Sequence, residues 1–207
     1  MSLGLELQII LLVITNMFFN GRSLLVGRCM PLNSIRRTTA TRLSMSSQAS
    51  FLGVSSDESS PNYDVAAQHL QKGKLVSFPT ETVYGLGANA RDVNAITSIF
   101  TAKKRPLTDP LIVHILNKES MYDLFDFDDA ERGQNNNKAR IVCESLAKAF
   151  WPGPLTIIYK ANKHKLTDNV ISTLTANTGY LGLRVPKHRI ARNLLKAVYP
   201  TPIAAPR

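Results

Sequence analysis

The sequence contains only two cysteines and one tryptophan among its 207 residues. Cys29 and Cys143 lie far apart and fit no metal-binding motif, so neither a disulfide framework nor a metal site is indicated, and a reducing compartment is the simplest interpretation. No run of about 20 apolar residues is present, so no stable membrane span is expected, and the apolar stretch 7–19 is too short for one. Two common nucleotide-binding motifs, GxGxxG at the start of a helix and GxxxxGK(S/T), are also absent.

Acidic residues are scarce as well. The chain has 15 Asp and Glu against 25 Lys and Arg, which gives a formal net charge of +10. A basic chain of this size favours nucleotides, phosphates or RNA as partners, although charge alone does not choose among them. Hydrophobic residues make up 44% of the chain, enough for a globular domain with its own core.

Residues 1–61 differ in composition from the rest. No acidic residue lies between Glu6 and Asp57, while Arg, Ser and Thr are frequent there. This pattern is typical of a mitochondrial or plastid transit peptide. The alternatives are a secretory or bipartite signal, a disordered tail, or a second start at Met45 that would leave the product in the cytoplasm. We predict a transit peptide or disordered leader at 1–61 and one domain at 62–207.

Apolar strands and amphipathic helices alternate in the second part of the chain, which favours an α/β sheet covered by helices. A polar segment at 126–138 is predicted to be a surface loop. The predicted helices are 64–71, 92–104, a helix beginning near Ser120, 139–150 and 188–199. The predicted strands are 75–78, 111–116, 155–159, 181–185 and 203–205.

The stretch 79–87 (PTETVYGLG) places two hydroxyls, a carboxylate and two glycines directly after an apolar strand. The next helix ends with three consecutive cations at 103–105, followed by Pro106. Hydroxyls, closely approachable backbone and clustered positive charge suit an anionic, phosphorylated ligand. Residue chemistry alone therefore predicts a phosphate-binding site near Thr80–Arg105, without a reaction.

Four ordered blocks make the chain resemble the threonylcarbamoyl-AMP synthase family, whose domain is called YrdC-like. They are 74–88, then 102–106 with 110–115, then 151–156, and finally 183–186. The resemblance implies a twisted, open, mixed α/β sheet flanked by helices, with a concave, positively charged surface. It implies that L-threonine, bicarbonate and ATP, with Mg²⁺, are condensed into threonylcarbamoyl-AMP for the modification of tRNA. A downstream threonylcarbamoyl transferase complex would then be a partner.

The resemblance also implies roles for individual residues. Lys103 and Arg105 match the pair that holds the ATP phosphates and acts in catalysis. The L-threonine contacts would be Thr80, Thr82, His114 and Arg184. Asp109 and Thr156 match ATP-side positions, and Asp109 stands where the family often has Asn, so either it faces away from the nucleotide or it alters the surroundings of the magnesium ion.

Purely structural interpretations of these residues stay open. The cations at 103–105 suit a helix C-terminus in any protein, and Thr80 could stabilise the turn after Pro79. A histidine such as His114 on an apolar strand is often part of the core, and Thr156 could be an ordinary strand residue. Arg184 is harder to explain by packing, because a buried cation requires a partner.

The resemblance ends at the last residues. The family continues Ala-Pro into Ser-Ala-Asn, whereas here Pro206 is followed by Arg207. We therefore expect the YrdC-like domain to be incomplete at its C-terminus, which would leave unpaired strand edges. Besides an active synthase, the alternatives are a non-catalytic module that binds nucleotide or double-stranded RNA and an inactive truncated isoform.

Overall fold

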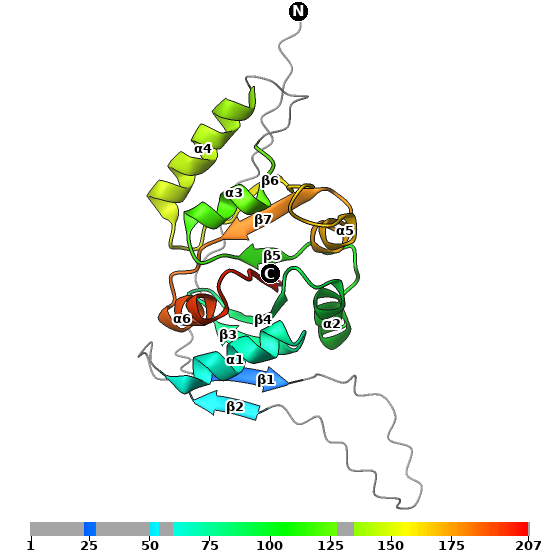
Figure 1. Cartoon of the computed structure of the whole chain (residues 1–207), viewed down its shortest axis with the longest axis vertical. Coiled ribbons are helices and arrows are strands. Elements are labelled where there is room, and N and C mark those ends of the chain that lie inside the picture. The colour runs from blue at the N-terminus through cyan, green and yellow to red at the C-terminus, as the bar shows by residue number, and fades with distance from the viewer. Residues whose placement is uncertain (1–22, 28–49, 54–59, 128–134, 207) are drawn as a thin grey trace, which may run out of the picture.

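The computed structural model describes residues 23–27, 50–53, 60–127 and 135–206. These residues form one eight-stranded sheet in the order β2-β1-β3-β4-β8-β5-β7-β6, and Figure 1 shows the strands stacked from β2 at the bottom to β6 at the top. Strands β5 and β7 pair in parallel and the other neighbours pair antiparallel. The predicted open mixed sheet flanked by helices is thereby confirmed.

Strands and helices are interspersed along the described chain. The strands are β1 (Ser23–Gly27), β2 (Ser50–Gly53), β3 (Leu75–Pro79), β4 (Tyr84–Asn89), β5 (Ile112–His114), β6 (Ile157–Lys160), β7 (Tyr180–Arg184) and β8 (Ile203–Ala205). The helices are α1 (Pro61–Gln71), α2 (Val93–Lys103), the 3₁₀ turn η1 (Lys118–Ser120), α3 (Met121–Leu124), α4 (Asn135–Phe150), α5 (Asp168–Thr175) and α6 (Arg189–Val198).

Helix α2 forms for local reasons. The Asp92 carboxylate accepts hydrogen bonds from the amides of Asn94 and Ala95 at 2.9 and 3.3 Å, which satisfies two donors at the start of the helix. Ile96, Ile99 and Phe100 recur at helical spacing and are buried. The helix ends where Lys104 adopts a left-handed conformation with φ of 52°.

The sheet separates two hydrophobic cores, because successive residues of a strand face opposite sides. Val76 and Phe78 belong to the core that α1 and α6 cover, and these two helices pack against each other. Leu75 and Val113 belong to the other core, to which α2, α3, α4 and α5 contribute. Each strand near the centre of the sheet therefore contributes side chains to both cores.

Strand β8 lies inside the sheet although it is the last element along the chain that the structure describes. Ala204 pairs with Ala88 on β4 and with Val113 on β5. All three residues of β8 are fully buried. Figure 1 accordingly places the C-terminal end of the chain in the middle of the picture, next to β5.

Several elements differ from the sequence prediction. Strand β4 and helix α5 were not predicted, and α4 begins at Asn135, inside the segment predicted to be a loop. The helix expected near Ser120 is split into η1 and the short α3. Residues 128–134 of the predicted loop lie outside the described part.

Two strands lie within residues 1–61, which we predicted to be a leader. β1 pairs with both β2 and β3, and so extends the sheet. That this segment directs import stays a prediction, and most of it lies outside the described residues. In the part of the chain that the structure describes, no helix is both long and apolar enough to pass through a membrane.

Gly87 offers a test of how closely β3, β4 and β8 approach. A Cβ atom there would lie 2.6 Å from Cγ2 of Ile203 and 2.7 Å from Cε1 of Phe78. Both neighbours are fully buried, so Gly87→Ala should lower the free energy of unfolding in urea by about 1–3 kcal/mol. The matched control is Gly53→Ala, which meets nothing within 4 Å and should change stability little. Equal stability of the two variants would contradict this close packing of β3, β4 and β8.

Candidate functional site

The loop between β3 and β4 is held by one threonine hydroxyl. Oγ1 of Thr80 donates to the carbonyl of Val83 at 2.6 Å and accepts from the amides of Thr82 and Val83, both at 3.2 Å. The hydroxyls of Thr80 and Thr82 lie 3.0 Å apart. Thr80 thus stabilises the turn, as one of its two sequence interpretations proposed, and it also directs its hydroxyl toward that of the buried Thr82.

Arg184, at the end of β7, is only 3% exposed and has the partners that burial requires. Nη2 donates to Oε1 of Glu81 at 2.9 Å and to Oγ1 of Thr82 at 3.3 Å. Nε donates to the carbonyl of Gly153 at 3.2 Å. The remaining nitrogen, Nη1, donates no hydrogen bond within the described residues. It is not among the side-chain atoms that are both fully buried and without a hydrogen-bond partner.

Glu81 completes this arrangement with its second oxygen. Oε2 accepts hydrogen bonds from the amides of Lys187 and His188, at 3.0 and 3.4 Å, just before α6. Burial by itself raises the pKa of Glu81, but the hydrogen bond and the charge of Arg184 outweigh it, so the pKa ends below its ordinary value. The carboxylate is therefore ionised at neutral pH.

His114 lies beside Arg184, because parallel pairing of β5 and β7 aligns the two residues. Its ring meets Phe78 edge-on with centroids 5.5 Å apart, and Nδ1 is buried without a hydrogen-bond partner. Burial, helped by the positive charge of Arg184, lowers the pKa of His114 to about 4, although Glu81 and a backbone hydrogen bond with Ile203 oppose the shift. The imidazole is therefore neutral at pH 7.

Thr156 precedes β6 and is buried. Its methyl carbon would lie 3.1 Å from a Cβ at Gly182 on β7. The β6–β7 register, continued by one residue, brings Thr156 opposite Arg184. The tertiary structure thus places Thr156 at the same end of β7 as Arg184.

The other predicted residues form a second cluster after α2. Lys103 is the exposed last residue of that helix. Nε and Nη2 of Arg105 donate to Oδ2 of Asp109 at 3.1 and 2.9 Å, with the two side chains 27% and 41% exposed. Asp109 therefore faces the predicted phosphate-binding arginine and neutralises part of its charge.

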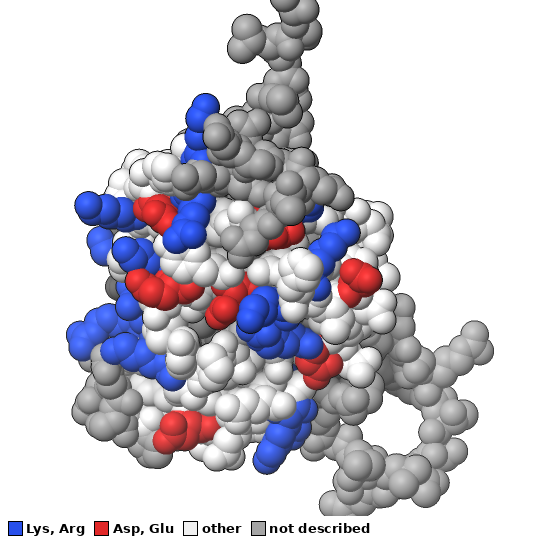
Figure 2. Space-filling view, turned by 45° about the horizontal axis from the view of Figure 1, so that its top comes forward, with Lys and Arg blue, Asp and Glu red and all other residues white. Residues whose placement is uncertain are grey.

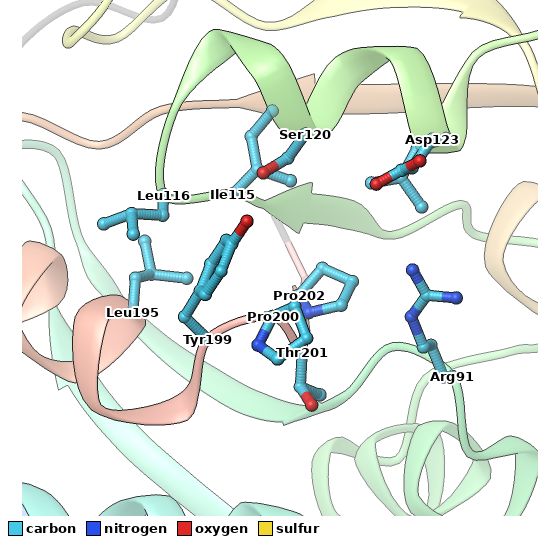
Figure 3. Close-up of a pocket in the computed structure, with 11 residues that line it drawn as sticks. Arg91, Ile115, Leu116, Ser120, Asp123, Leu195, Tyr199, Pro200, Thr201 and Pro202 are labelled. Carbon is cyan, nitrogen blue, oxygen red and sulfur yellow. The ribbon is translucent and has the colours of Figure 1, made fainter.

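Charge and cavities do not by themselves mark the site. On the face in Figure 2, Lys and Arg side chains lie among Asp and Glu, so the net charge does not form one continuous basic surface there. An open pocket lies where the chain leaves β4 and β5 and enters β8, and Figure 3 shows Arg91 and Asp123 pointing toward each other on one side of it and Tyr199 on the other. It contains none of the predicted site residues.

Sequence reasoning placed Thr80, Thr82, His114 and Arg184 together, and the structure does bring them together. It did not assign Glu81 to the cluster, although Glu81 lies within the stretch 79–87. The signal that could have found it was the need of a cation on an apolar strand for a nearby carboxylate.

The buried His114 predicts a pH dependence of stability. The unfolded chain binds a proton near the ordinary pKa of 6.5 and the folded protein only near 4. Between these values the unfolded state binds more protons, so the free energy of unfolding should fall as the pH falls, by up to about 3 kcal/mol from this residue. Urea denaturation at about pH 7 and about pH 4.5 measures the loss.

His114→Asn should lose clearly less stability over this range than the wild type. Some dependence should persist, because the pKa values of His69 and His188 are also lowered, in both cases mainly by burial. Substitution of the exposed His164 by Asn is the matched control and should keep the wild-type slope. A wild-type slope in His114→Asn would contradict a neutral buried imidazole.

Comparison with known proteins identifies relatives for most of the chain. Residues 68–207 match the Sua5/YciO/YrdC family model, which is described as "Telomere recombination". A Pyrococcus abyssi protein named threonylcarbamoyl-AMP synthase is 44% identical over 142 residues, which cover 69% of this chain and 37% of the relative. A Bacillus subtilis protein of the same name is 40% identical over 146 residues, covering 70% and 38%. The chain therefore spans little more than a third of the length of these relatives.

Solved structures agree with the sequence comparison. P. abyssi Sua5 complexed with L-threonine is 41% identical to this chain with a TM-score of 0.59, covering 72% of this chain and 38% of that one. Escherichia coli YciO, at 22% identity and a TM-score of 0.55, covers 69% and 62% and shows the common fold alone. With a family model that matches two thirds of its length and relatives at 40–44% identity, this chain belongs to the Sua5/YciO/YrdC family.

Proposed function

We propose that this chain binds L-threonine at the Thr80–Thr82–His114–Arg184 cluster and ATP at the Lys103–Arg105 cluster, and that with bicarbonate it forms threonylcarbamoyl-AMP. The product would supply the threonylcarbamoyl group for the modification of tRNA through a downstream transferase complex. The names of the relatives support this reaction class.

The observation that carries the proposal is a pair of unused polar atoms on neighbouring strands. Nδ1 of His114 is buried without a hydrogen-bond partner, and Nη1 of the neighbouring Arg184 donates no hydrogen bond within the described residues. Burying unpaired polar groups costs free energy, which a ligand that pairs with them would recover. A carboxylate fits the guanidinium, and the hydroxyl of Thr82 offers a further partner for a small polar amino acid.

The solved relative in complex with L-threonine supports the choice of amino acid. Neutral His114 adds no second positive charge beside Arg184. The cluster with Glu81 therefore holds one cation and one anion before the ligand arrives, a balance that suits a zwitterion better than a polyanion.

The second cluster suits phosphates. Lys103 is exposed at the end of α2, and Arg105 offers a planar fork two residues later. These cations would hold the ATP phosphates and stabilise the charge that develops as pyrophosphate leaves. Thr156 would add a hydroxyl on the nucleotide side.

Mg²⁺ would accompany ATP as its phosphate complex. Within the described ranges, no three His, Cys, Asp or Glu side chains are grouped so as to hold a metal ion.

The chemistry requires positioning rather than a covalent nucleophile. The amino group of threonine attacks the carbon of bicarbonate, water leaves, and a carbamate forms. A carbamate oxygen then attacks the α-phosphorus of ATP and pyrophosphate departs, with the protein holding the three reactants in contact. Cys143 takes no part, because burial raises the pKa of its thiol to about 11.

Pyrophosphate release tests the function directly. With labelled ATP and bicarbonate, the full chain should release pyrophosphate only when L-threonine is added. Arg105→Ala should reduce the rate by about 100-fold or more, because it removes charge stabilisation of the leaving group. The matched control is Arg140→Ala, which removes an exposed arginine that pairs with Glu144 at 2.8 Å. Absence of threonine-dependent pyrophosphate from folded protein would refute the function.

Asp109→Asn tests the ATP side separately. The substitution removes the carboxylate that forms an ion pair with Arg105, which leaves the arginine available to the ATP phosphates. The KM for ATP should therefore fall by roughly two- to five-fold, as expected for a partly exposed ion pair. The KM for threonine should stay the same. A rise in the KM for ATP would show instead that the Asp109 carboxylate contributes to nucleotide binding, and Glu144→Gln serves as the surface control.

A further inference from the structure

Glu81 lies where three distant parts of the chain meet. It belongs to the β3–β4 loop, its Oε1 contacts Arg184 on β7, and its Oε2 accepts the amides that precede α6. The contacts join residues 103 and 106 positions apart in the sequence. With its side chain 19% exposed, Glu81 is more accessible than Arg184 but still mostly enclosed.

These contacts determine how Arg184 is presented. Nε is fixed by the carbonyl of Gly153 and Nη2 by Glu81 and Thr82, so the plane of the guanidinium is defined and Nη1 is left for a ligand. Without the Glu81 carboxylate, Nη2 would keep only the Thr82 hydroxyl at 3.3 Å. A neutral contact of that length restrains a guanidinium less than a charged one at 2.9 Å.

The same carboxylate holds the loop that carries the two threonines. Its bonds to the amides of Lys187 and His188 tie residue 81 to the start of α6. Both neighbours of Glu81 in the sequence, Thr80 and Thr82, face the Arg184 cluster through their hydroxyls. Glu81 therefore sets the position of the arginine and of the hydroxyls at once.

We propose that Glu81 is a positioning residue of the amino-acid site: it holds Arg184 and the Thr80–Thr82 loop in the geometry that accepts the carboxylate of L-threonine, and both of its oxygens are committed to protein partners. This inference rests on the proposed function. It assigns to Glu81 an effect on threonine binding that is separate from ATP binding, because the ATP cluster after α2 is held by its own Arg105–Asp109 pair.

The test is Glu81→Gln in the full chain, with KM measured separately for threonine and ATP in the pyrophosphate assay. The KM for threonine should rise about ten-fold or more, as expected for the loss of a charged hydrogen bond, while the KM for ATP stays within about two-fold. Glu144→Gln is the matched control, because it removes a carboxylate that pairs with a different arginine. It should leave both constants unchanged.

A double variant keeps the test decisive if the unpaired Arg184 destabilises Glu81→Gln. In Glu81→Gln with Arg184→Gln, no unpaired charge is left buried, so the protein should fold. Because Arg184 is one of the two parts that Glu81 holds, the losses of threonine binding in the two single variants should not add up fully in the double variant.

Three results would overturn the inference. They are a wild-type KM for threonine in Glu81→Gln, an equal rise in both KM values, and fully additive losses of threonine binding in the double variant. Absence of threonine-dependent activity in the wild type would refute the proposed function first, and this inference with it.

Discussion

The burial of Arg184 is the constraint on which the site depends. A guanidinium that is 3% exposed must find its partners within the protein, because water cannot supply them. Its partners come from the β3–β4 loop and from Gly153, in the turn before β6. Satisfying one cation therefore brings together segments that are distant in the sequence, and Glu81 extends the connection to α6.

Close packing at the centre of the sheet makes this possible. Gly87 leaves room for Ile203 and Phe78, so β3, β4 and β8 approach one another closely. β8 then pairs with β5, and β5 pairs in parallel with β7. That last register sets His114 beside Arg184. A shift of one residue would send one of the two side chains to the opposite face of the sheet.

The two residue clusters differ in physical character. The Arg184 cluster is buried, its charges are paired, and Nδ1 of His114 has no hydrogen-bond partner in it. The cluster after α2 is partly open to solvent, and Asp109 already neutralises part of its charge. A small zwitterion suits the first environment and a polyphosphate the second, which is the division of labour that the proposed reaction needs.

Local elements were predictable where their signals are local. The α2 helix has a capping Asp92, apolar residues at helical spacing and a following proline, and it was predicted to within a residue at each end. Strand β4 was missed, because Gly-Leu-Gly-Ala has little intrinsic strand preference and becomes a strand only by pairing with β3 and β8. The start of α4 at Asn135 was missed because asparagines and a lysine favour a loop when considered alone.

By itself, the sequence determined the alternation of strands and helices, the family resemblance, and the types of side chain available near residues 80, 105 and 184. Only the tertiary structure decided that Glu81 is the partner of Arg184, that Asp109 occupies Arg105, and that His114 is neutral with a free Nδ1. The reason is that a pairing across 103 residues depends on strand register and on what burial removes from water, and neither is encoded in a local pattern.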